Sequence, residues 1–155
     1  MNKFKEIKEY SSARMYNYGI FMLSRREYGR AELKEKMFRH SSDQLMINEV
    51  LDKLEKENYL SNSRAINFII NQYKNKESIY KINQRLINKG FEKDLIAESL
   101  QIIKELDSSQ IILELLKKKF KIYNINNRDK MIRFLASKGF KFNQINKTIE
   151  EFKNE

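Results

Sequence analysis

The sequence predicts an all-α protein in which three tandem three-helix repeats stack into an elongated, curved molecule. Three observations support this prediction. The 155 residues include no proline and only four glycines, so helices meet few interruptions and tight hairpins lack the residues they need. Apolar residues recur at helical spacing along the chain. The same apolar order also returns every 49 residues, and units this small bury a core only by stacking on their neighbours.

The second and third helices of each repeat carry equivalent apolar residues. In the second helix they are Leu33 and Met37, then Ile82 and Leu86, then Met131 and Leu135. In the third helix they are Ile47, Leu51 and Leu54, then Ile96, Leu100 and Ile103, then Ile145, Ile149 and Phe152. The first helix of the last repeat matches at a step of 47 residues, so we expect two extra residues in the loop 123–127.

Residues that start and stop helices agree with this register. Cap-forming side chains open each repeat at Ser11, at residues 61–63 and at residues 107–109. Gly90 and Gly139 follow the second helices of the last two repeats, where a left-handed glycine commonly ends a helix. The predicted domains are therefore residues 1–60, which include an N-terminal segment, 61–106 and 107–155.

Aromatic residues at helical spacing are expected to belong to the core rather than to a base-stacking platform, because amphipathic helices bury one stripe. The residues concerned are Tyr16, Phe21, Phe68, Tyr73 and Phe120.

Basic residues are segregated within the repeats of this chain, whose formal charge is +10 and whose pI is about 9.6. The first two helices carry seven basic and three acidic residues in 11–41, six and one in 61–91, and eight and three in 107–140. The third-helix segments have no net positive charge. Stacked repeats would align the basic helices into one positive ridge that favours a polyanionic or acidic partner. A compositional bias toward lysine, with no partner at all, is the alternative.

The candidate partner-binding residues are the cations of this ridge. They are Arg25, Arg26, Arg30 and Lys34 in the first repeat; Lys74, Lys76, Lys81 and Arg85 in the second; and Lys117, Lys118, Lys119, Arg128, Lys130 and Arg133 in the third.

The residues that most enzymes need are not arranged for catalysis. Cysteine is absent, and the single histidine, His40, stands beside a predicted helix end, where imidazoles commonly interact with free carbonyls. The acids Asp52, Glu55 and Glu57 have the spacing of a solvated helix face. Neither a phosphate-binding glycine loop nor a dinucleotide-binding glycine turn occurs. We therefore expect no catalytic residue, metal or cofactor.

The compartment is expected to be the cytoplasm. Residues 1–6 lack the apolar run of a signal peptide, and no stretch approaches the roughly 20 apolar residues that cross a bilayer. A membrane partner is not expected, and we expect a monomer.

Residues 23–33, Leu-Ser-Arg-Arg-Glu-Tyr-Gly-Arg-Ala-Glu-Leu, resemble the signature opening of the RecX family, L-S-R-R-E-[HY]-S-R-x-E-L. Residues 50–60 are similar to the family segment V-L-x-x-L-x-x-x-G-x-[LI], and residues 86–91 to L-x-x-K-G-[IVF]. The likeness extends over roughly residues 13–152. The chain departs from the pattern at Gly29, a serine in the family; at Asn58, a glycine; at residues 61–63, an acidic run; and at residues 78–82, which lack a proline.

The resemblance implies a cytoplasmic, non-catalytic regulator that lies in the groove of the RecA filament on single-stranded DNA. Such a protein limits the recombinase, ATPase and co-protease activities of the filament, and so acts in homologous recombination, DNA repair and the SOS response. Direct contact with single-stranded DNA is expected to be weak. Within the signature, Leu23 and Leu33 are interpreted as core, and Glu27 and Glu32 as cap or ion-pair residues. Arg25, Arg26 and Arg30 are expected to be exposed.

Two other classes of function are compatible with the sequence. A helix-turn-helix protein that acts directly on DNA would also be basic and helical, but would concentrate base-reading side chains on one recognition helix. A membrane-surface or scaffold protein is disfavoured, because no segment combines a wide apolar face with a basic opposite face.

Overall fold

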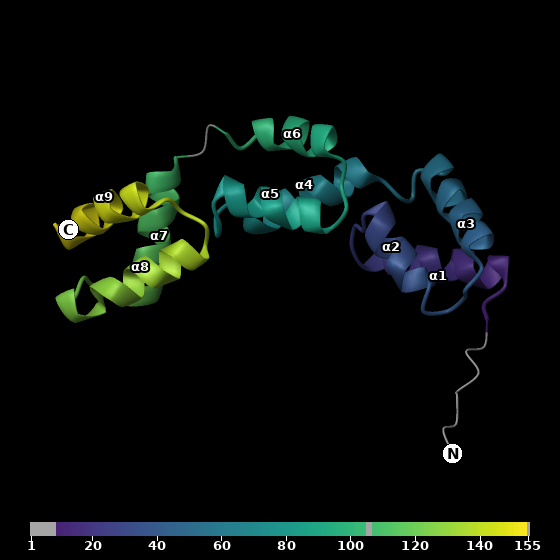
Figure 1. Ribbon diagram of the computed structural model, residues 1–155, viewed down its shortest axis with the longest axis horizontal. Helices are drawn as coiled ribbons and strands as arrows, with labels where there is room; N and C mark the ends of the chain where they lie inside the picture. Colours follow the sequence, from purple (N-terminus) through teal and green to yellow (C-terminus); the bar gives the residue numbers. More distant parts are fainter. Residues whose placement is uncertain (1–8, 105–106, 155) are drawn as a thin grey trace, which may run out of the picture. The chain divides into compact units, whose positions relative to one another are not determined.

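The computed structural model describes residues 9–104 and 107–154, and in these ranges every regular element is a helix (Figure 1). The helices are α1 (Ser12–Arg25), α2 (Arg30–Met37), α3 (Gln44–Lys56), α4 (Asn62–Tyr73), α5 (Ile79–Asn88), α6 (Lys93–Gln101), α7 (Ser108–Phe120), the short 3₁₀ helix η1 (Ile125–Asn127), α8 (Arg128–Ser137) and α9 (Phe142–Lys153). The all-helical class and the three-by-three order of the helices are confirmed.

The helices begin and end at the predicted residues. Ser11 Oγ accepts a hydrogen bond from the Arg14 amide at 3.3 Å, and Ser61 Oγ accepts one from the Arg64 amide at 3.3 Å. Asp107 caps α7 in the same way. Gly90 and Gly139 have φ angles of 80° and 84°, the left-handed conformation that ends α5 and α8.

Contacts divide the described chain into two compact units. One unit holds the described residues up to Phe68 together with Ile87–Leu95, and the other holds Ile69–Leu86 together with the described residues from Ile96 onward. The division therefore passes through the helices of the middle repeat. The predicted three-domain boundaries stay a prediction, and residues 1–8, 105–106 and 155, which they include, lie outside the described residues.

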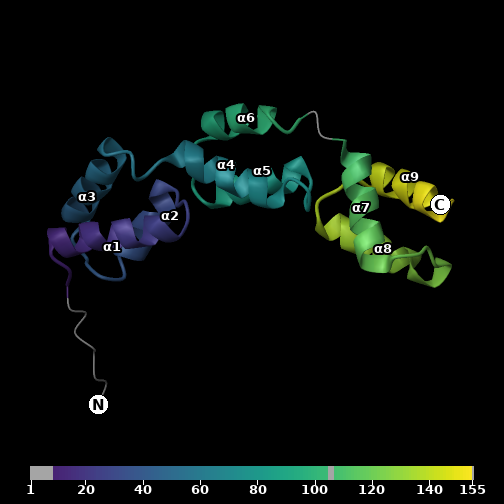
Figure 2. The ribbon, with the colours of Figure 1, turned by 180° about the vertical axis from the view of Figure 1, so that it is seen from behind.

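In the first unit, α1, α2 and α3 pack on one another around an apolar cluster (Figure 1). The cluster includes Leu33 and Met37 of α2 and Ile47, Leu51 and Leu54 of α3, all fully buried. In the second unit, α7, α8 and α9 pack on one another in the same way, as Figure 2 also shows from behind. Their cluster includes Met131, Leu135, Ile145, Ile149 and Phe152. The repeating apolar register thus marks the core.

The expectation that all five aromatic residues lie in the core is wrong for two of them. Phe21 is 51% exposed and Phe68 is 38% exposed. Each follows a buried position, Gly19 or Ile66, by two residues, which is about 200° around a helix and places the ring away from the buried stripe. Tyr16, Tyr73 and Phe120 are partly buried.

His40 packs against aromatic rings instead of the predicted carbonyls. Its ring stacks on Tyr10 with centroids 4.5 Å apart and meets the edge of Tyr18 at 4.7 Å. No group of acidic or histidine side chains in residues 9–104 and 107–154 could hold a metal ion. Nor is any helix in these ranges long and apolar enough to cross a membrane.

Candidate partner-binding surface

The fourteen candidate cations do not share one environment. At least six have their charged groups bound by other parts of the protein: Arg26, Arg30, Lys81, Arg85, Arg128 and Arg133. The others are exposed or half-buried. This distinction separates cations that hold the fold together from cations that face solvent.

Arg26 is bound at the junction between α1 and α2. Its Nη2 lies 2.6 Å from Glu32 Oε1, and its guanidinium lies 3.6 Å from the centroid of the Tyr28 ring. Lys89 Nζ approaches the other oxygen of Glu32 at 3.3 Å. Burial alone would raise the pKa of Glu32. The hydrogen bonds from Arg26 and Lys89 and the positive charge of both residues outweigh this effect, so the pKa of Glu32 is lowered overall. Glu32 is thus an ion-pair residue, as interpreted from the sequence.

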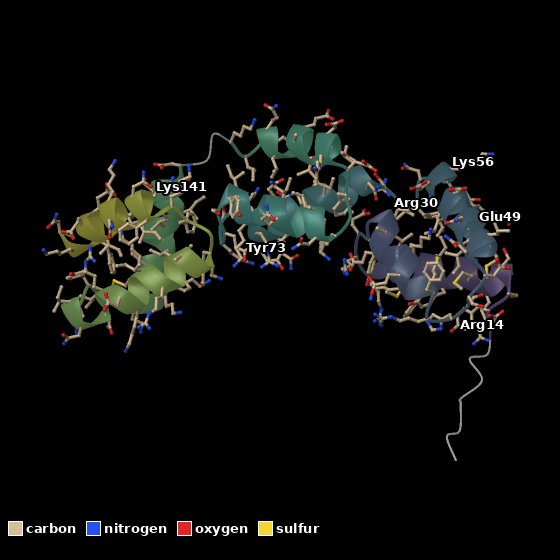
Figure 3. All side chains as sticks on the ribbon, in the orientation of Figure 1. Arg14, Arg30, Glu49, Lys56, Tyr73 and Lys141 are labelled. Atoms are coloured by element: carbon tan, nitrogen blue, oxygen red, sulfur yellow. The ribbon has the colours of Figure 1, made fainter. Side chains whose placement is uncertain are left out.

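Arg30 connects α2 to the acidic helix α3. Arg30 is labelled in Figure 3. Its Nη1 lies 2.6 Å from Glu55 Oε2 and its Nη2 lies 2.6 Å from Asp52 Oδ1, so one guanidinium holds two carboxylates. Only 27% of its side chain is exposed. The fork geometry of arginine suits such a double contact.

The expectation that Arg25, Arg26 and Arg30 are all exposed is therefore correct for Arg25 alone. Arg25 is exposed at the end of α1, with its guanidinium 4.6 Å from the Phe21 ring centroid. Counting charges by segment missed the ion pairs of Arg30, because α3 packs directly against α2 and its acids reach the basic helix. It also could not show that Arg26 pairs with Glu32 within its own segment.

In the second repeat, Arg85 is held by Glu77, whose side chain is only 4% exposed. Arg85 Nε and Nη2 lie 2.6 and 2.7 Å from the two carboxylate oxygens, and the guanidinium lies over the Tyr73 ring. These hydrogen bonds are the main reason that the pKa of Glu77 is lowered. Lys81 Nζ donates to the Ser137 carbonyl.

The remaining candidates of the first two repeats have no carboxylate partner among the described residues. Lys76 is exposed, while Lys34 and Lys74 are half-buried. Lys34 Nζ lies 5.9 Å from the Phe38 ring centroid.

In the third repeat, Arg128 is bound by the side chains of α9. Its Nη2 lies 3.1 Å from Asn146 Oδ1 and 3.8 Å from Glu150 Oε1. The exposed candidates here are Lys117, Lys118, Lys119, Lys130 and Arg133. Lys119 Nζ lies 3.9 Å from the Phe134 ring centroid.

Besides Lys89, two further cations that the sequence analysis did not select take part in these contacts. Arg64 pairs with Glu27 at 3.0 Å and donates to the carbonyls of Asn58 and Tyr59. Lys138 Nζ lies 5.7 Å from the Phe134 ring centroid. Lys138 is equivalent to Lys89 in the 49-residue register, and the Lys-Gly-Phe segment that contains each of them could have pointed to both.

The chain is similar in sequence to curated regulatory proteins. No family model matches the chain. The "Regulatory protein RecX" of Haemophilus influenzae is 32% identical over 136 residues, which cover 84% of this chain and 89% of that protein. The chain belongs to the RecX family. The RecX protein of Streptococcus mutans is 25% identical over 158 residues, which cover 95% of this chain but only 60% of that protein, so the chain spans about three-fifths of this longer relative.

Solved RecX structures share the fold. The crystal structure of RecX from Lactobacillus salivarius matches with a TM-score of 0.71 and 19% identity, over 93% of this chain and 97% of that one. A second crystal structure of a regulatory protein RecX matches with a TM-score of 0.69 and 18% identity, over 93% of this chain and 72% of that one.

The departure from the RecX signature at Gly29 has a packing reason. Gly29 is the N-cap of α2 and makes no side-chain cap of its own. A Cβ at this position would lie 2.6 Å from two ring carbons of Phe91, so the glycine makes room for the large residue of the Lys-Gly-Phe segment. Asn62 Oδ1 accepts the Arg30 amide at 2.8 Å, so a residue of α4 caps α2 in place of the missing side chain.

The departure at Asn58 follows from backbone geometry. Asn58 has a φ of 61°, which glycine adopts freely and asparagine tolerates better than most other residues. Its Oδ1 also accepts a hydrogen bond from Arg64 Nη1 at 2.8 Å, which stabilises the turn between α3 and α4.

Proposed function

We propose that this protein is a non-catalytic regulator that binds the RecA filament on single-stranded DNA and limits its recombinase, ATPase and co-protease activities. The observation that carries the proposal is membership of a family whose relatives are named regulatory proteins. The recombinase as partner follows from the family resemblance. The regulator acts as a monomer in the cytoplasm, without a cofactor, and in this way restrains recombinational DNA repair and the SOS response.

The distribution of cations supports a negatively charged partner. Arg25, Lys76, Lys118 and Lys130 are exposed and have no carboxylate partner within 9–104 and 107–154. They recur in all three repeats rather than on a single helix, which suits a repeating polymer better than one short DNA site. Contacts to successive filament subunits would add through linkage, so inhibition is expected at fewer regulator molecules than recombinase subunits.

The test adds the purified protein to RecA filaments preformed on single-stranded DNA and follows ATP hydrolysis and strand exchange. We expect both rates to fall in low salt, and we expect no nuclease or ATPase activity from the protein alone. An unchanged rate of ATP hydrolysis at equimolar protein would contradict the proposal. Tight binding to a single DNA sequence would support the helix-turn-helix alternative instead.

A charge-matched pair of variants tests the role of the exposed cations. One replaces Arg25, Lys76 and Lys118 with glutamate; the control replaces with glutamate Lys53, Lys56 and Lys104, which are also exposed but lie on the third helices or just after them. Both change the net charge equally. We expect the first variant to lose inhibition at least tenfold more than the control. Equal losses would show that only net charge matters.

A further inference from the structure

The second helix of each repeat carries a stripe of three positions separated by four residues, and the repeat register allows the stripes to be compared. In the second repeat the stripe is Lys81, Arg85 and Lys89; in the third it is Lys130, Phe134 and Lys138. Positions four apart on a helix lie on one face, about 6 Å apart along the axis. The two stripes are therefore comparable surfaces with different chemistry.

The stripe of the second repeat is fully used inside the protein. Lys81 donates to the Ser137 carbonyl, Arg85 is held by both oxygens of Glu77, and Lys89 pairs with Glu32. Each of these three cations therefore already has a partner within the protein.

The stripe of the third repeat is not neutralised. Lys130 is exposed, and neither Lys130 nor Lys138 forms an ion pair with a described carboxylate. Between them, the half-buried ring of Phe134 is flanked by Lys119 Nζ from α7 at 3.9 Å and by Lys138 Nζ at 5.7 Å. The Phe120 ring meets Phe134 edge-on, with centroids 6.1 Å apart. All of these residues lie in one compact unit.

We infer that Lys119, Lys130, Phe134 and Lys138 form a subsite for single-stranded nucleic acid. The lysines would contact phosphates of the backbone, and Phe134 would stack on a base. Lysine side chains cover the ring now, but stacking of a base on an aromatic ring is worth more than an exposed cation–π contact, so a base can displace them. The inference rests on the proposed function, since it identifies where the DNA of the filament would meet the regulator.

The experiment measures binding of the full chain to a labelled single-stranded oligonucleotide of mixed sequence by fluorescence anisotropy, without recombinase, over a range of salt. For Lys119→Ala with Lys138→Ala, we expect at least a tenfold loss of affinity. The slope of log affinity against log salt should also fall by about 1.4, because each phosphate contact on a single strand contributes about 0.7. For Phe134→Leu, which keeps an apolar side chain in the core, we expect about a fivefold or greater loss with an unchanged slope.

The matched control is Lys53→Ala with Lys56→Ala. It removes the same charge, and Lys53 also lies over an aromatic ring, Tyr16, at 4.4 Å. We expect little change in affinity. Circular dichroism melting shows whether each variant is folded, and Lys130→Ala, at an exposed residue, tests the subsite without touching the ring.

Each outcome separates this inference from the proposed function. If the subsite variants lose oligonucleotide binding, the subsite is supported. If the wild-type protein in the same series does not inhibit RecA, the proposed function is contradicted while the subsite stands. Variants that bind the oligonucleotide like wild type would overturn the subsite, even if they no longer inhibit RecA, because the patch would then contact the recombinase. A wild type that binds no oligonucleotide in low salt, or an equal loss in the control, would also overturn it.

Discussion

Gly90 and Gly139 occupy the same position in successive repeats, yet they meet the preceding repeat at different distances. A Cβ on Gly90 would lie 3.1 Å from Ala31 Cβ. A Cβ on Gly139 would lie 2.5 Å from Ser78 Oγ and 2.9 Å from Lys81 Cβ. The first contact lies inside one compact unit and the second inside the other. In both contacts the glycine after a second helix therefore lies close to the second helix of the preceding repeat. The approach is closer at Gly139 than at Gly90.

The polar contacts around the two glycines differ more than the packing does. Lys89 Nζ pairs with Glu32 in the first contact. The equivalent residues in the second contact are Lys138 and Lys81, which are both cationic and cannot pair. Hydrogen bonds to main-chain carbonyls replace the ion pair there: the Ser78 amide donates to the Lys138 carbonyl at 3.0 Å, and Lys81 Nζ donates to the Ser137 carbonyl. One register therefore tolerates two different sets of polar interactions.

A second pair of equivalent positions shows the same contrast. In the first repeat, Tyr28 is buried and Lys36 Nζ lies 5.7 Å from its ring centroid. In the second repeat these positions are Glu77 and Arg85, which form the buried bidentate ion pair. The first repeat thus places a cation over an aromatic ring where the second repeat has a salt bridge, so at this pair of positions only the second repeat should lose stability as the pH falls.

The largest expected effect distinguishes the two glycines. Gly139→Ala should lower the free energy of unfolding by about 2 to 4 kcal/mol, because the left-handed backbone disfavours a Cβ and the new methyl would overlap Ser78 and Lys81. Gly90→Ala should lower it by about 1 to 2 kcal/mol, mainly through the backbone. Urea unfolding followed by circular dichroism measures both. Equal losses, or a larger loss at Gly90, would show that the second contact is not the tighter one.

The sequence predicted the backbone framework well because that framework depends on local patterns. Apolar spacing located the buried residues of α2, α3, α8 and α9, and the caps at Ser11, Ser61 and Asp107 were visible as residue types. Glycine at positions 90 and 139 identified the helix ends correctly, since φ above zero is a local requirement.

The environments of individual cations were less predictable because they depend on tertiary contacts. Arg30 meets Asp52 and Glu55 from a helix that begins fourteen residues later, and charge counts by segment treat the two helices as separate. Asn62 as the cap of α2 was also hidden, because its acceptor lies 32 residues from the amide it binds. No sequence pattern within a single helix reports such a contact.

The next effect concerns Glu77 and pH. Its pKa is lowered in the folded state, so the ion pair stabilises the fold above the ordinary value of 4.5, and this contribution is lost as the pH falls toward the lowered pKa. Glu77→Gln should therefore destabilise the protein by about 1 to 3 kcal/mol at neutral pH. The difference from wild type should shrink as the pH falls from 6 to 3. Thermal melts over this range measure it.

Glu35→Gln is the matched control for Glu77. Glu35 is 77% exposed and faces Arg39 at 3.8 Å, so its removal should change stability by less than about 0.5 kcal/mol at any pH in this range. A constant difference between Glu77→Gln and wild type at every pH would mean that the buried ion pair is not the source of the stabilisation.

The smallest expected effect compares two ways of capping equivalent helices. Ser78 caps its own helix, α5, because Ser78 Oγ accepts a hydrogen bond from the Lys81 amide at 3.2 Å. The equivalent helix α2 instead depends on Asn62, because Gly29 has no side chain. Asn62→Ala should lower stability by about 1 kcal/mol, and Asn62→Asp, which keeps the acceptor beside a helix N-terminus, should restore most of it. Hydrogen exchange at the Arg30 amide provides the specific readout, since only loss of the Asn62 bond exposes that amide. Faster exchange at Arg30 in Asn62→Ala, with unchanged exchange at Lys81, would establish that α4 caps α2. Unchanged exchange at Arg30 would contradict this cap, because the Arg30 amide would then be protected without the Asn62 bond.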